Sequence, residues 1–130
     1  MLGTQGMTSQ LVFQRIRNRV IETLDLLVEC ETTPPDLGMN ELVNCWEDWV
    51  PSPLPENYFP EPVFAPEEER LIRDVSLTMD AFCDATPRTI QDDVATLRLP
   101  QWAAVVTTAK VARSTMMKRG RMPEEEELSL

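Results

Sequence analysis

The sequence predicts an all-α protein: a bundle of four or five helices with a proline- and aromatic-rich extended strap, about residues 51–65, packed across it. Apolar residues recur at spacings of three and four along most of the chain, which is the periodicity of amphipathic helices. No stretch shows the strict alternation of apolar and polar residues that is typical of strands. The 130 residues suffice for one core, so we expect a single helical domain over 1–130, with flexible ends at 1–7 and 122–130.

The first helix is expected to begin after Thr8, a favourable N-cap residue, and to end before the Thr-Thr-Pro-Pro run at 32–35. Its charges oppose the helix dipole, because arginines lie in its first half and acidic residues lie towards its end. We therefore expect other parts of the chain to neutralise these charges. One apolar stripe follows this helix: Val12, Phe13, Ile16, Val20, Leu24, Leu27 and Val28.

A second helix is expected over about 39–50, where Pro51 ends it. The stretch from Asn44 to Arg70 then holds five of the eight aromatic residues and six of the eleven prolines. Proline excludes a regular helix or a central strand in this stretch, whereas its aromatic side chains favour burial. This combination predicts an ordered, extended strap that its aromatic side chains hold against the helices.

Proline also marks the starts of two later helices. Pro66 precedes three glutamates that suit the positive end of a helix dipole, and Pro100 begins the last helix, which ends at Gly120. A short helix between them is expected from Thr89. The apolar faces predict that three large rings share one buried core: Trp46, Phe82 and Trp102.

The residue types exclude several kinds of chemistry. The chain has no histidine, which removes Ser-His-Asp and Cys-His catalytic groups and the common zinc ligand sets. It has no glycine-rich phosphate loop and no EF-hand spacing. Cys30, Cys45 and Cys83 form no Cys-x-x-Cys pair, so we expect buried, reduced thiols. We therefore predict a protein that is not an enzyme and that uses no metal and no cofactor.

The formal net charge of −10 opposes binding to nucleic acid. We expect a cytoplasmic protein without a membrane partner, because no apolar run is long enough to span a bilayer and the first residues lack signal-peptide features. Residues 34–70 hold nine acids and one base, a net charge of −8, whereas residues 100–122 hold five bases and no acid. The acidic stretch favours a basic partner, although solubility alone would also explain it. The bases are expected to meet acids of the same chain.

The stretch from Trp46 to Trp49 is the local cluster that suggests a contact surface, because tryptophan is enriched at interface hot spots. In the alternative interpretation, Trp46 lies in the core, Trp49 lies under the strap and the two acids between them face water. Short polyproline turns in the strap could also be offered to an aromatic groove of another protein. The candidate partner-binding residues are Glu47, Asp48, Trp49, Tyr58 and Phe59.

Stoichiometric protein–protein binding is the function that these features favour, as an adaptor or an immunity-type neutraliser of a partner more basic than this chain. The alternative is a small-ligand sensor, or an enzyme that uses carboxylates alone, with its pocket between bundle and strap. That alternative requires an enclosed pocket of roughly several hundred Å³ with converging acids. A subunit of a helical homo-oligomer is a third option.

Overall fold

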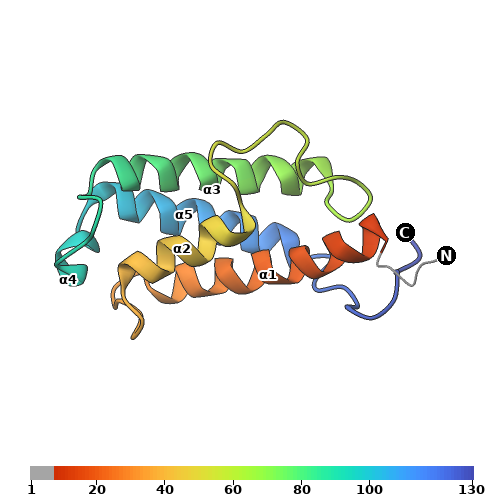
Figure 1. Ribbon diagram of the computed structural model, residues 1–130, viewed down its shortest axis with the longest axis horizontal. Coiled ribbons are helices and arrows are strands. Elements are labelled where there is room, and N and C mark those ends of the chain that lie inside the picture. The colour runs from red at the N-terminus through yellow and green to blue at the C-terminus, as the bar shows by residue number, and fades with distance from the viewer. Residues whose placement is uncertain (1–7) are drawn as a thin grey trace.

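The computed structural model describes residues 8–130, and the expected flexible end at 1–7 lies outside them. The described residues form five helices and no strand, which confirms the all-α class. The four long helices run along the length of the molecule, and the short α4 lies at one end (Figure 1). The helices are α1 (Ser9–Glu29), α2 (Met39–Trp49), α3 (Pro66–Asp84), α4 (Asp93–Thr96) and α5 (Pro100–Met116).

Local signals fix where the helices begin and end. The side-chain oxygen of Thr8 accepts a hydrogen bond from the N–H of Leu11 and caps α1, as predicted. At the start of α3, the carboxylate of Glu68 accepts a hydrogen bond of 2.8 Å from the N–H of Ala65. Beyond α5, Gly120 has a φ of +76°, a left-handed conformation that favours glycine after a helix. The starts of α1, α3 and α5 lie where the sequence predicts them, but α4 begins at Asp93 and not at Thr89, and α5 ends at Met116, before the predicted end at Gly120.

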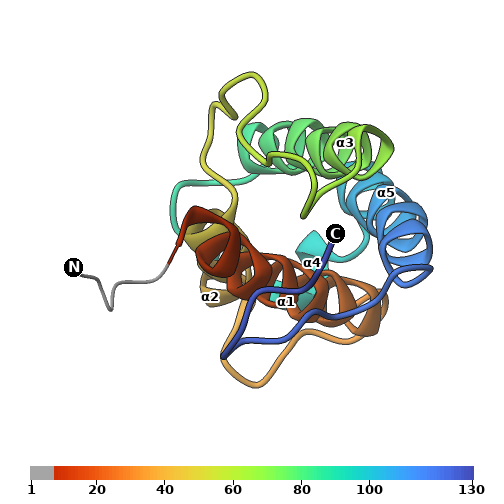
Figure 2. The same ribbon diagram turned by 90° about the vertical axis from the view of Figure 1, so that its right-hand side faces the viewer.

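The long helices enclose one core. α5 packs against both α3 and α1, and α2 packs against α1 (Figure 2). Trp46, Phe82 and Trp102 all lie in one buried cluster, as predicted. The ring centroids of Phe82 and Trp102 are 5.1 Å apart, and the indole N–H of Trp102 donates a hydrogen bond of 3.1 Å to the carbonyl of Cys30. This bond satisfies the polar group that burial of the ring would otherwise leave unpaired.

Ion pairs between helices neutralise charges that oppose the dipole of α1. Lys110 of α5 lies 3.0 Å from Glu31, and Arg113 of α5 lies 3.7 Å from Asp25. Both acids belong to the last part of α1 or follow it directly. The bases of the last helix therefore meet acids of the same chain, as the sequence analysis expects.

Residues 51–65 connect α2 to α3 without helix or strand and arch beside the N-terminal half of α3 in both ribbon views (Figures 1 and 2). Arg73 of α3 donates hydrogen bonds of 2.9 Å to the carbonyls of Leu54 and Pro55. Side chains from the end of this connection enter the core cluster: Phe59, Val63 and Phe64.

Residues 122–130 were expected to form a flexible end, but in the structure they contact α1 and the core. Met122 is buried in the core cluster, and its N–H and carbonyl both bond to the side chain of Asn18 on α1, at 2.9 and 2.8 Å. The residues that follow continue along α1 (Figure 2). This acidic segment has few apolar side chains that could anchor it. The anchors are instead polar side chains of α1 that bond to its main chain.

Candidate functional site

The structure places the five candidate partner-binding residues in different environments. The side chains of Glu47 and Asp48 are exposed, and Tyr58 is half-buried. Trp49, the last residue of α2, is 37 % exposed, so it is not covered as the alternative interpretation expects. Phe59 is only 2 % exposed. A side chain this deeply buried cannot contact a partner, so Phe59 does not belong to the candidate surface.

An aromatic cluster explains the burial of Phe59. Its ring centroid lies 4.9 Å from that of Tyr58 and 4.8 Å from that of Phe64. Phe13 of α1 meets Tyr58 and Phe64 edge-on, with centroids 6.4 and 6.5 Å apart. Edge-to-face contacts of this kind are favourable. The cluster joins the connection between α2 and α3 to α1, and Tyr58 forms its partly exposed side.

A hollow of about 410 Å³ lies beside Trp49 on the surface of α1. Its apolar lining comes from Trp49 together with Val12 and Ile16, which lie one helical turn apart on α1. This combination of an accessible indole ring and an adjoining apolar hollow is typical of a site that another molecule covers. We name it the Trp49 hollow. Its charged lining comes from three further side chains: Arg15, Arg19 and Glu124.

The charged side of the Trp49 hollow is held together by Glu124. A hydrogen bond of 2.8 Å from Asn18 lowers the pKa of Glu124 below its ordinary value, and the nearby guanidinium groups lower it further. Arg19 forms an ion pair with this carboxylate, and Arg121 lies 3.6 Å from it. Glu124 is therefore ionised at neutral pH and links the C-terminal segment to α1.

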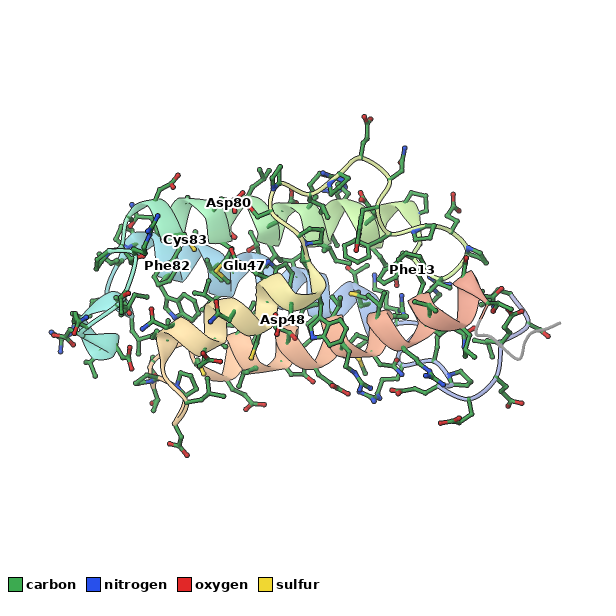
Figure 3. All side chains as sticks on the ribbon, in the orientation of Figure 1. Phe13, Glu47, Asp48, Asp80, Phe82 and Cys83 are labelled. Carbon is green, nitrogen blue, oxygen red and sulfur yellow. The ribbon has the colours of Figure 1, made fainter. Side chains whose placement is uncertain are left out.

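Glu47 lines a different hollow, of about 420 Å³, between α2 and the connection that follows α3. There it lies close to Cys83 (Figure 3). Burial raises the pKa of the Cys83 thiol to about 11, and the carboxylates of Glu47, Asp80 and Asp84 contribute to the increase. The thiolate is the reactive form of cysteine, so this thiol is a poor nucleophile at neutral pH. All three cysteines are free thiols.

A third hollow, of about 330 Å³, lies between the connection and α3, where the alternative function places its pocket. Two carboxylates line it, those of Glu61 and Glu69. The carboxylate of Glu69 is already paired with Arg73 at 2.7 Å. Within residues 8–130, no group of three or more His, Cys, Asp or Glu side chains is arranged to hold a metal ion.

A row of amide side chains on α1 was not predicted from the sequence. Gln10, Gln14 and Asn18 follow one another at intervals of four residues, which places them on one face of the helix. They bind the main chain of residues 122–128. The regular spacing of these amides is visible in the sequence and could have indicated a polar binding face.

Comparison of the chain with protein-family models, with curated proteins and with solved structures finds no match. In the part of the chain that the structure describes, no helix has both the length and the apolar character needed to cross a bilayer. The function must therefore be inferred from the surfaces described above.

Proposed function

We propose that this protein works in the cytoplasm by stoichiometric binding of another protein, as an adaptor or an immunity-type neutraliser of a partner more basic than itself. The proposed contact surface combines the end of α2 with the edge of the strap formed by residues 51–65. The contact residues are Glu47, Asp48, Trp49 and Tyr58.

The exposure of Trp49 is the observation that supports this proposal most strongly. Tryptophan is a large apolar side chain that globular proteins usually cover to a greater extent, and here it is 37 % exposed beside an apolar hollow. A partner that covers the ring and inserts a side chain between Trp49, Val12 and Ile16 would bury both the indole ring and the apolar hollow. Binding energy at interfaces concentrates on aromatic anchors of this kind.

The exposed acids near the end of α2 favour a basic partner. Glu47 and Asp48 are exposed, and neither forms an ion pair with another of the residues 8–130. The bases of α5 and of the residues after it are, in contrast, largely paired with acids of the same chain. The end of α2 therefore presents uncompensated negative charge, which accelerates encounter with a positively charged protein.

The small-ligand or carboxylate-enzyme alternative has less support. The hollow between the strap and α3 presents Glu61 and Glu69, and Arg73 already neutralises Glu69 at 2.7 Å. Acid–base catalysis by a pair of carboxylates requires both groups to reach the reacting atoms of one bound substrate. Binding of a protein partner requires only the exposed surface at the end of α2.

Affinity capture from the native cell, followed by mass spectrometry, tests the proposal. The wild-type chain should retain a basic protein in about equal molar amount, and Trp49→Ala should lose it. Leu77→Ala is the matched control, because Leu77 is an exposed apolar residue on α3. Recovery of the same proteins with the wild type and with Trp49→Ala would remove the basis of the proposal.

A further inference from the structure

We propose that the face of α1 that carries Gln14 and Asn18 is a groove for an acidic peptide segment of another protein that bends around the Gln14 side chain. Residues 122–128 of the chain itself occupy this groove and act as a built-in competitor. The inference goes beyond the proposed function, because it concerns α1 and not the acidic end of α2. The groove and the proposed contact surface share the Trp49 hollow. The amides of α1 belong only to the groove and the acids of α2 only to the contact surface, so either can fail without the other.

The contacts of Asn18 show how the groove recognises a peptide. Its side-chain N–H donates to the carbonyl of Met122 at 2.8 Å, and its side-chain oxygen accepts from the N–H of the same residue at 2.9 Å. This is the paired pattern with which a neighbouring strand would bond to an extended chain. Asn18 therefore binds the main-chain N–H and carbonyl of one peptide residue, independently of the side chain of that residue.

Gln14 continues this pattern one turn towards the start of α1. Its side-chain N–H₂ donates to the carbonyls of Pro123 at 2.8 Å and Glu126 at 2.9 Å. Its side-chain oxygen accepts from the N–H of Leu128 at 2.9 Å, and Gln10 donates to the carbonyl of Leu128 at 2.8 Å. Since these bonds involve only main-chain groups of the peptide, a different sequence in the same conformation would satisfy them.

Burial explains why this groove fits a peptide better than an apolar surface. Gln14 is 0 % exposed and Asn18 is 1 % exposed beneath the C-terminal segment. Buried amide groups must be hydrogen-bonded, and an apolar surface on the groove would leave them unpaired. Any replacement for residues 122–128 must therefore offer main-chain N–H and carbonyl groups at matching positions.

The groove also selects for acidic side chains. The carboxylate of Glu124 accepts a hydrogen bond of 2.8 Å from Asn18 and pairs with Arg19. Arg15 donates to the carbonyl of Glu124 at 2.6 Å. Two residues earlier, the side chain of Met122 is buried in the core cluster. The preferred peptide therefore carries an apolar residue two positions before a glutamate.

The Trp49 hollow gives another protein an advantage over the attached segment. A covalently attached segment has an effective concentration in the millimolar range, so a separate peptide must gain contacts that the segment lacks. Glu124 is the residue of the segment that lines the hollow, alongside Val12, Ile16 and Trp49. A large apolar side chain next to the glutamate would fill this space. A second copy of the chain carries the same segment and gains no such contact.

Fluorescence anisotropy with two labelled peptides tests the groove. One peptide has the sequence of residues 121–130, and the other carries tryptophan in place of Glu125 (E125W). The full chain is compared with its Glu124→Lys variant, in which lysine repels Arg15 and Arg19 and releases the attached segment. We expect Glu124→Lys to bind the E125W peptide about ten-fold more tightly than the wild type does.

Three further variants, each made in the Glu124→Lys background, identify the contacts. Gln14→Ala with Asn18→Ala should weaken binding of both peptides about ten-fold, whereas the exposed amide control Gln91→Ala should not change it. Trp49→Ala should weaken binding of the E125W peptide and leave the plain peptide unaffected.

Several outcomes would overturn the proposal. One is the absence of saturable binding to a folded Glu124→Lys variant, and another is equal binding after Gln14 and Asn18 are both replaced. Plain peptide that binds as tightly as E125W, together with concentration-dependent dimerisation, would identify a second copy of the chain as the occupant.

A second experiment applies if circular dichroism shows that Glu124→Lys does not fold. The wild type is then titrated with millimolar E125W peptide, and the NMR signal of the Leu128 amide is followed. An unchanged signal contradicts the groove.

Discussion

Arg17 of α1 and Glu68 of α3 form a bidentate ion pair in the interior of the molecule, with Nη1–Oε1 and Nη2–Oε2 distances of 2.8 and 2.9 Å. The other bonds of this guanidinium go to the carbonyls of Gly120, Val63 and Met116. One side chain of α1 thus links the start of α3 to the end of α5 and to the end of the connection between α2 and α3. The guanidinium carbon also lies 5.8 Å from the ring centroid of Phe64, a member of the aromatic cluster.

Removal of the carboxylate from this pair should destabilise the fold strongly. Glu68→Ala leaves the buried guanidinium of Arg17 without its counter-charge, which typically costs about 3–5 kcal/mol. The free energy of unfolding in urea measures the loss. Glu56→Ala is the control, because Glu56 is an exposed acid in the connection between α2 and α3, and it should change stability by no more than about 0.5 kcal/mol. A loss from Glu68→Ala no larger than that of the control would contradict the assigned role.

Stability should also depend on pH through Glu68. Burial raises the pKa of this carboxyl, but hydrogen bonds from Arg17, Arg119 and the N–H of Ala65 outweigh burial and hold the pKa below its ordinary value of 4.5. A carboxyl with a lower pKa in the folded state stabilises the fold above its unfolded pKa and loses this contribution as the pH falls through its folded pKa. The free energy of unfolding should therefore decrease below about pH 4.5, and Glu68→Gln should show a weaker dependence in the same titration.

Hydrogen exchange tests whether the C-terminal segment is docked in solution. The N–H of Met122 donates to Asn18 and is buried, so it should exchange slowly in the wild type. Asn18→Ala removes the acceptor and should bring exchange of this amide close to the rate of an unprotected chain. Asn44→Ala, a change at an exposed residue of α2, should leave it protected. Rapid exchange of Met122 in the wild type would show that the segment is free.

The Cys83 thiol should react slowly near neutral pH. In a chain with Cys30→Ala and Cys45→Ala, the rate of reaction with a disulfide reagent should keep rising with pH up to about 11, the pKa of Cys83. Glu47→Gln removes one of the negative charges that oppose the thiolate and should shift this profile to lower pH. Glu41→Gln, on the same helix, should leave the pH profile of the reaction rate unchanged. A profile with its midpoint near the ordinary cysteine value would disprove the environment described for Cys83.

The helices could be predicted from the sequence because their signals are local. The side chain of Thr8 caps α1 by accepting a hydrogen bond from the N–H of Leu11, three residues later. Pro66 is itself the first residue of α3. The apolar periodicity likewise identified the faces that bury Trp46 and Trp102. Each of these signals depends on neighbours within a few residues, so no knowledge of the packing is needed to interpret them.

The candidate site could be predicted only in part, because its burial and its contacts depend on residues distant in the chain. Phe59 was a candidate contact residue, but its ring packs with Phe64 in a cluster that includes Phe13 of α1. The pairing of Asn18 with Met122 joins residues 104 positions apart. Neither the composition of the acidic segment nor its local pattern contains that information.

The most direct test of the account is to measure the rates at which the captured partner binds and leaves the surface at the end of α2. Glu47→Lys with Asp48→Lys should slow association about ten-fold and weaken its dependence on salt, because rim charges act mainly on encounter. Trp49→Ala should leave association nearly unchanged and accelerate dissociation by about ten-fold or more, because a desolvated ring holds a complex together. If these folded variants all show wild-type association and dissociation rates, the partner does not bind at this surface.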